Sequence, residues 1–174
     1  MKNKDFSVIP VGGKYSEVSA FHESGHAIVA THFGQRVSEI DLSTPVPTCT
    51  HTKGDNLDDL AIMTLGGVAA QVIREWPMLA GIWKDTRERL VRKRLEANTF
   101  DLNQYSSFAS PDNPETFDSH AQKALNIIDD NWAKVQAIAS YLRTAGKVTS
   151  NAEFLSIVEE SESACEAVLE SGII

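Results

Sequence analysis

The chain has 174 residues, of which 42% are hydrophobic and 23% are charged, so it can form one domain with a real core. Its net charge of −8 argues against nucleic acid or an anionic membrane as the main partner, because both repel an acidic surface. No run approaches the roughly 18–20 apolar residues of a membrane helix, and the first residues lack the apolar core of a signal peptide. We therefore expect a cytoplasmic protein without a membrane segment.

The first half of the chain predicts one helix and two short strands before a long second helix. Ser16 can cap a helix that runs to about residue 33, and Gly34 can end it. Alternating apolar residues predict a short strand over 36–42, and a second strand is expected over 48–52, after two prolines.

The remaining elements are predicted to be helical. Asn56 can cap a helix over 57–75, and further helices are expected over 78–97, 101–109, 117–142 and from Ser150 to about 171. The helix over 57–75 carries four small residues in five positions, which let another helix approach closely: Gly66, Gly67, Ala69 and Ala70.

These elements predict a mostly α fold of the α+β kind, with a small β element after the first helix. We expect one domain over residues 1–174. Within it, residues 1–14 form an arm, residues 15–109 form the part that carries the motif described next, and residues 117–172 form the C-terminal helices.

The segment His22-Glu23-Ser24-Gly25-His26 carries the chemistry. His22 and His26 are four residues apart, so a helix places both imidazoles on one face, as two ligands of one Zn²⁺ require. Glu23 lies beside the metal but off the ligand axis, where it can take a proton from a water that the metal activates. Buried histidine pairs without a ligand are uncommon because their ring nitrogens must be satisfied.

A catalytic zinc needs a third protein ligand and leaves its fourth position to water. His32 points elsewhere on the helix, and the longer metzincin motif is out of register because residue 29 is not a glycine. A glutamate on the following helix is another option, with Glu75 the nearest candidate by position.

Three segments resemble the peptidase domain of FtsH and related AAA+ membrane proteases. The stretch Ala20-Phe-His-Glu-Ser-Gly-His-Ala-Ile-Val-Ala30 is similar to that family's zinc motif, and Leu65-Gly-Gly-Val-Ala-Ala70 is similar to its Leu-Gly-Gly helix. Residues 127–149 resemble its C-terminal helices. The resemblance covers residues 16 to 160 and implies a zincin-like helical metallopeptidase domain.

The resemblance also implies an aspartate as the third ligand, in an Asn-Asp-Leu segment that opens a helix. Asp101 in Phe100-Asp101-Leu102 is the best match, although Phe100 stands where the family has asparagine. Asp85 is the rival, because its distance from the Leu-Gly-Gly helix is closer to the family's spacing. We favour Asp101, because an apolar-periodic helix can hold a ligand in the core, whereas Asp85 opens a heavily charged stretch.

The predicted function is a zinc-dependent metalloendopeptidase that hydrolyses unfolded or short polypeptides. The sequence holds no phosphate-binding Gly-x-x-x-x-Gly-Lys-Ser/Thr motif and no membrane helix, so it resembles an isolated peptidase domain that needs an ATPase or adaptor in trans for folded substrates. The alternatives are a non-catalytic zinc-stabilised adaptor, or pseudoprotease, that binds a protein partner, and a zinc hydrolase of a non-peptide amide. An intact Glu23 favours the enzyme.

Several weaker signals accompany the motif. The strand over 37–42 either pairs with an extended substrate or is structural. Cys49 is more plausibly a plain thiol than an inhibitory metal ligand, and His51 a solvated histidine rather than an oxyanion donor. The basic stretch 84–94 can face solvent, or the acidic last helix within the molecule or across a homo-oligomer.

Overall fold

The computed structural model describes residues 13–76 and 84–170, and these residues are mostly helical with one small antiparallel sheet. The predicted mostly α class is confirmed at this level. No helix in these ranges is long and apolar enough to cross a membrane. The elements are α1 (Glu17–His32), β1 (Val37–Asp41), β2 (Thr48–His51), α2 (Leu57–Glu75), α3 (Lys84–Ala97), α4 (Thr99–Ser106), α5 (Pro114–Asp130), α6 (Trp132–Ala145), β3 (Lys147–Val148) and α7 (Asn151–Glu170).

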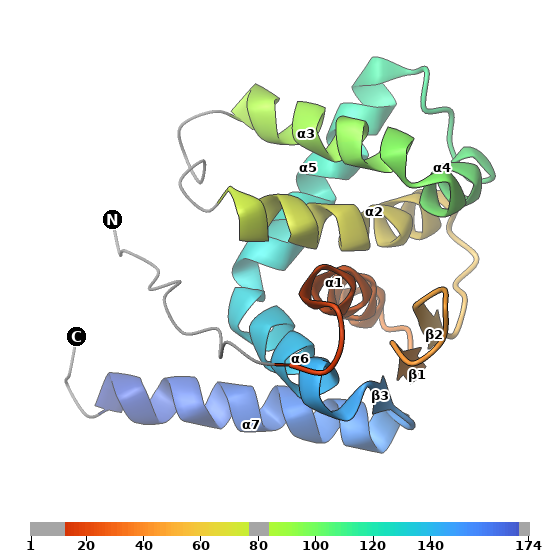
Figure 1. Cartoon of the computed structure of the whole chain (residues 1–174). Coiled ribbons are helices and arrows are strands. Elements are labelled where there is room, and N and C mark those ends of the chain that lie inside the picture. Colours follow the sequence, from red (N-terminus) through yellow and green to blue (C-terminus); the bar gives the residue numbers. More distant parts are fainter. Residues whose placement is uncertain (1–12, 77–83, 171–174) are drawn as a thin grey trace.

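Helix α1 lies at the centre of the molecule, with α2 on one side, α6 on the other and the sheet beside it (Figure 1). It begins where predicted, because the Ser16 side chain accepts a hydrogen bond from the N–H of Ser19. Gly34 follows its end with φ +73°, a conformation that favours glycine. Ten of its sixteen residues are buried, so α1 is a core element rather than a surface helix.

Helices α1 and α2 touch backbone to backbone at two glycines. A Cβ atom on Gly25 would lie 2.3 Å from the carbonyl oxygen of Gly66, and a Cβ atom on Gly66 would lie 2.7 Å from the carbonyl oxygen of Gly25. The small residues of α2 therefore do allow the close helix approach that the sequence predicts. This contact sets how close α1 and α2 lie to each other, and so how the side chains of α1 are placed against α2.

The sheet has the order β2-β1-β3, with both pairs antiparallel. Ile40 of β1 pairs with Cys49 on one side and with Val148 on the other. Strand β3 was not predicted, because two residues after Gly146 are too few to show a period. Strand β1 is thus the central strand of the sheet, and β2 forms an edge.

The prediction of one helix over 117–142 is wrong, because the chain breaks at Asn131 into α5 and α6. The backbone of Asn131 leaves the helical region, and its side-chain amide donates to the carbonyl oxygen of Ile127. An asparagine that bonds to the preceding turn competes with the helix. Helix α7 begins as predicted, since the Ser150 hydroxyl accepts from the N–H of Glu153.

Arginines of the basic helix α3 form ion pairs with acidic residues of α5 and α2. Arg87 pairs with Asp129 at 2.7 Å, and Arg94 pairs with Glu75. Helix α7 lies on the opposite side of the molecule, packed against α6 (Figure 1). The basic stretch therefore does not face the acidic last helix within the described part of the chain. Residues 78–83 of the predicted helix over 78–97 lie outside that part, as do most of the expected arm and residue 171.

Candidate metal centre

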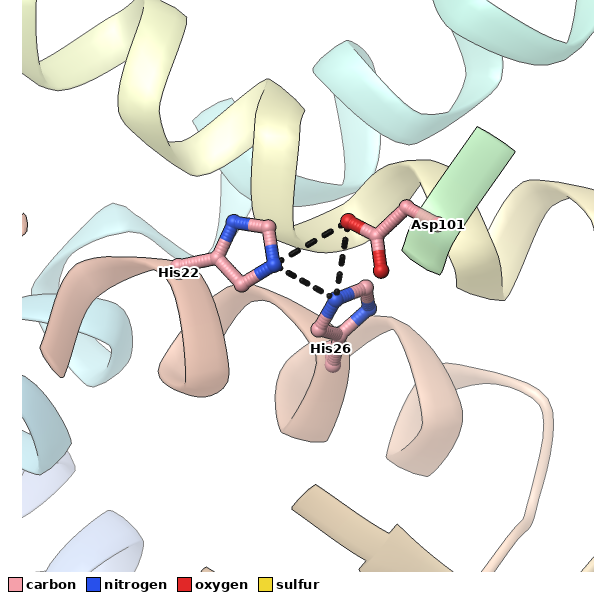
Figure 2. A group of neighbouring side chains, drawn as sticks. All are labelled: His22, His26 and Asp101. Carbon is pink, nitrogen blue, oxygen red and sulfur yellow. Dashed lines mark hydrogen bonds and ion pairs between the residues drawn. The ribbon is translucent and has the colours of Figure 1, made fainter. Parts of the chain in front are cut away.

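Helix α1 presents His22 and His26 side by side, with both rings directed at α4 (Figure 2). Their Nε2 atoms lie 3.1 Å apart, and the rings meet edge to face. The i, i+4 spacing alone produces this arrangement, because residues one turn apart stack on the same helix face. The two Nε2 atoms converge on one point, as ligands of a single cation would.

Asp101 completes the cluster from the first turn of α4. Its Oδ2 atom lies 3.1 Å from Nε2 of His22 and 3.6 Å from Nε2 of His26 (Figure 2). The carboxylate is buried, and it forms with the two histidines the group that can hold a metal ion in the described residues. The structure therefore brings together the three residues that the sequence predicts as ligands.

The other candidate ligands do not join this cluster in the structure as described. Glu75 is the last residue of α2 and pairs with Arg94. His32 ends α1, where its ring packs against Phe33. The side chain of Asp85 lies outside the described residues, so the choice between Asp85 and Asp101 rests on the observed position of Asp101.

A backbone carbonyl of α2 sets the tautomer of His26. Nδ1 of His26 lies 3.0 Å from the carbonyl oxygen of Met63, which can only accept, so Nδ1 carries the hydrogen. In a neutral ring the lone pair is then on Nε2, toward His22 and Asp101. A ring whose other nitrogen donates to a carbonyl is the usual arrangement for a histidine that binds a metal. His22 has no such partner among the described residues, although its Nδ1 is buried.

Gly67 makes room for the two imidazoles. A Cβ atom at this position would lie 2.6 Å from Nε2 of His26 and 2.7 Å from Nε2 of His22. Gly67 therefore leaves space for the two imidazole rings, whereas Gly66 contacts the backbone of α1. Sequence reasoning missed this role, and the signal for it was the Gly-Gly pair itself.

Opposite charges and burial compete at the cluster. Burial raises the pKa of Asp101, but the two histidines outweigh it and hold that pKa well below the usual range. Burial lowers the pKa of His26, but Asp101 and Glu23 raise it to about 9. Without a metal, the Asp101 carboxylate therefore favours the protonated form of His26. A divalent cation would replace that proton with a larger charge at the same place.

Glu23 lies beside this cluster and is also buried. Burial raises its pKa, against the opposing effect of His26 and His22. Glu23 and the three ligand residues line one cleft of about 480 Å³, within the usual size range of ligand pockets. A buried carboxyl group, a cluster that could hold a metal ion and an accessible volume thus meet at one place.

The wall of the cleft opposite α4 is strand β2, all four residues of which line it. Of the two alternatives for the strand over 37–42, the structural one agrees with the topology, because β1 already has a neighbouring strand on each side. Strand β2 is an edge strand, and such strands present unpaired N–H and C=O groups. Strand β2 is therefore an edge strand whose residues border the cleft.

Two side chains of β2 were weighed as catalytic or inhibitory groups. Burial and the charge of Glu23 raise the pKa of Cys49 well above its usual value, so this residue is a neutral thiol. Burial lowers the pKa of His51, whose Nδ1 donates to the carbonyl of Thr52 at 2.7 Å. A neutral His51 then offers an acceptor at Nε2, not the donor that an oxyanion needs.

No protein-family model matches the chain, and no curated protein matches it in sequence. The resemblance to the FtsH peptidase domain therefore stays a prediction from three segments of sequence. The site itself is described by its own geometry.

Proposed function

We propose that the chain is a zinc metallopeptidase of the zincin type, related to the FtsH peptidase domain, with His22, His26 and Asp101 as metal ligands and Glu23 as general base. The observation that carries this proposal is the burial of Glu23 in the same cleft as the three ligand residues. A purely structural metal site has four protein ligands and no need of an adjacent base. Here three ligand residues leave one position open to the cleft.

The donor set supports a metal of the zinc class. Two imidazole nitrogens and one carboxylate on converging helices match catalytic zinc sites. Gly67 leaves space where any side chain would occupy the position between the rings. Bound zinc would lower the pKa of a coordinated water and polarise a scissile carbonyl. The same three residue types also serve iron(II) sites, so metal analysis of the purified protein is the first measurement.

Glu23 performs the proton transfers of the proposed reaction. Its carboxylate takes a proton from water as the water oxygen bonds to the carbonyl carbon of the peptide. It then delivers that proton to the amide nitrogen as the carbon–nitrogen bond breaks. The second proton of the water also passes to the amine, so the products are a carboxylate and a protonated amine, and Glu23 returns to its ionised state. The raised pKa of Glu23 favours this use, because a base works best when its pKa is near the working pH.

An extended polypeptide fits the cleft better than a small amide does. The β2 edge can pair with the main chain of a peptide, a mode that needs no particular sequence. Val46 and Phe100 also line the cleft, although 63% and 68% of their surfaces are exposed. Apolar side chains left open at a cleft mouth indicate a partner surface. An unfolded segment with apolar side chains offers both a main chain that can pair with β2 and apolar groups that can contact Val46 and Phe100.

Proteolysis of a denatured, casein-like protein by zinc-loaded enzyme tests the proposal. Glu23→Gln should retain the metal and the fold but lose cleavage by about 10²–10⁴-fold, as expected when a general base is removed. Glu96→Gln is the control, because Glu96 is exposed on α3 and does not line the cleft. Stable folded proteins should resist cleavage unless an ATPase acts in trans.

One result would favour the non-catalytic adaptor instead. If zinc-loaded protein cuts neither a peptide library nor a denatured protein, the peptidase proposal fails. A partner protein that binds Glu23→Gln and the parent equally well would then support the adaptor.

A further inference from the structure

The short helix α4 places Asp101 against His22 and His26 of α1. It has eight residues, and only Asp101 and Tyr105 are buried. A helix of this length is not stable alone, so its position depends on contacts with the rest of the molecule. Two polar contacts hold it, one before Asp101 and one a turn after it.

The first contact is made by Asn98, the N-cap of α4. Its Oδ1 accepts from the N–H of Asp101 at 3.2 Å, and its Nδ2 donates to Oδ2 of Asp101 at 2.9 Å. The same Oδ2 atom faces both histidines. Asn98 thus caps the helix and also aims the ligand oxygen. The asparagine caps of α2 and α5, Asn56 and Asn113, accept from backbone N–H groups only.

The second contact is made by Tyr105, one turn after Asp101 and on the same face of α4. The Tyr105 side chain is fully buried, and its hydroxyl lies 3.0 Å from Nδ1 of His120 on α5. Nε2 of His120 lies 3.5 Å from a carboxylate oxygen of Asp58, at the start of α2. With Nε2–H directed at Asp58, Nδ1 accepts the Tyr105 hydroxyl. This chain of contacts ties α4 to α5 and α2.

We propose that Asn98, Tyr105 and His120 are positioning residues that hold the Asp101 carboxylate in metal-binding geometry. This inference rests on the proposed metal site but concerns residues outside the set of metal ligands. Asn98 fixes the rotation of the Asp101 carboxylate. Tyr105 and His120 fix the position of α4 relative to α5 and α2. Outer contacts of this kind typically change metal affinity by about 10–100-fold.

The test uses two conservative variants with matched controls. Asn98→Ser keeps an oxygen for the cap but removes the Nδ2 donor to Asp101. Tyr105→Phe keeps the buried ring but removes the hydroxyl. The controls are Asn113→Ser, which makes the same change at the cap of α5, and Tyr141→Phe, which removes a hydroxyl that bonds Glu153 at the surface.

Metal binding is measured with Co²⁺ and with Zn²⁺ on metal-free protein. The visible absorption spectrum of bound Co²⁺ reports ligand geometry, and competition with a chelator reports Zn²⁺ affinity. Asn98→Ser and Tyr105→Phe should each lower affinity by about 10–100-fold and alter the Co²⁺ spectrum. Both controls should leave affinity and spectrum unchanged. Unfolding midpoints of the metal-free variants should differ little between each variant and its control.

Two outcomes would overturn the inference, and they are distinguishable. If His22→Ala abolishes Co²⁺ binding while both α4 variants keep the parent affinity and spectrum, the positioning role fails and the metal site stands. If His22→Ala binds Co²⁺ as the parent does, the metal site is wrong, and the proposed function fails together with this inference.

Discussion

The two halves of the candidate metal centre are held in opposite ways. The histidine half belongs to α1, a sixteen-residue core helix fixed by the contact between Gly25 and Gly66. The aspartate half belongs to α4, an eight-residue helix fixed by the side-chain contacts of Asn98 and Tyr105. Close packing defines the first half and directed hydrogen bonds define the second. Damage to the first should therefore affect folding, whereas damage to the second should affect metal binding.

The largest effect is expected from the aspartate itself. Asp101→Asn removes the negative charge from the cluster and should reduce zinc affinity by more than the roughly hundredfold limit of outer contacts. Asp85→Asn should leave zinc affinity unchanged. Isothermal titration of the metal-free proteins measures both. Loss of zinc in Asp85→Asn, with retention in Asp101→Asn, would move the ligand to α3.

The next effect tests the packed half of the centre. Gly25→Ala would place a Cβ atom 2.3 Å from a backbone oxygen of α2, so the two helices must separate. Overpacking of this kind should lower the free energy of unfolding by about 2–3 kcal/mol. This loss is larger than the stabilisation expected from the higher helix propensity of alanine. Urea unfolding of metal-free protein measures the loss. An unchanged midpoint would mean that the crossing of α1 and α2 is looser than the structure shows.

Gly67→Ala makes the same chemical change at the residue next to Gly66, with a different expected result. Its Cβ atom would meet the ends of the two imidazoles rather than backbone, and rings can turn away. The metal-free protein should therefore be as stable as the parent or slightly more stable, because alanine favours the helix. Zinc affinity should fall at least about tenfold, since both nitrogens must move. A loss of stability equal to that of Gly25→Ala would remove the distinction between the two glycines.

The sequence predicts the packed half better than the hydrogen-bonded half, and the reason is physical. The i, i+4 spacing of His22 and His26 is enough to place both rings on one face of a helix. The small residues of α2 predict that another helix packs closely against it. Asp101 is distant in the chain, and Phe100 departs from the pattern of the FtsH family beside it, so Asp101 had to be chosen by resemblance and by the apolar period of its helix. Asn98, Tyr105 and His120 were not predicted, because their contacts join three helices and leave no periodic signal.

The same reasoning explains the errors in the fold. The break at Asn131 depends on one side-chain hydrogen bond within an otherwise continuous apolar pattern. Strand β3 exists because β1 offers an edge to two residues after Gly146. Both features depend on tertiary context, which local propensity does not contain. With β3 in place, β1 is the central strand, which decides in favour of the structural alternative for the strand over 37–42.

The smallest expected effect is a pH dependence confined to the hydrogen-bonded half. Burial lowers the pKa of His120, with the Asp58 carboxylate opposing this effect and Lys123 adding to it. The unfolded chain therefore takes up a proton below about pH 6.5 that the folded protein resists. The free energy of unfolding should fall as the pH drops through this value, by at most about 1.4 kcal/mol per pH unit.

His120→Gln should remove this contribution, so the stability difference between parent and variant should shrink between about pH 7.5 and pH 5.5. Denaturant unfolding of the metal-free proteins at both pH values measures the difference. Amide hydrogen exchange locates it, and exchange should accelerate in α4 at the lower pH while α1 stays protected, because local opening follows the weakest contacts. Equal acceleration in both helices would show that the two halves open together, and the contrast between packing and hydrogen bonding would then not govern the site.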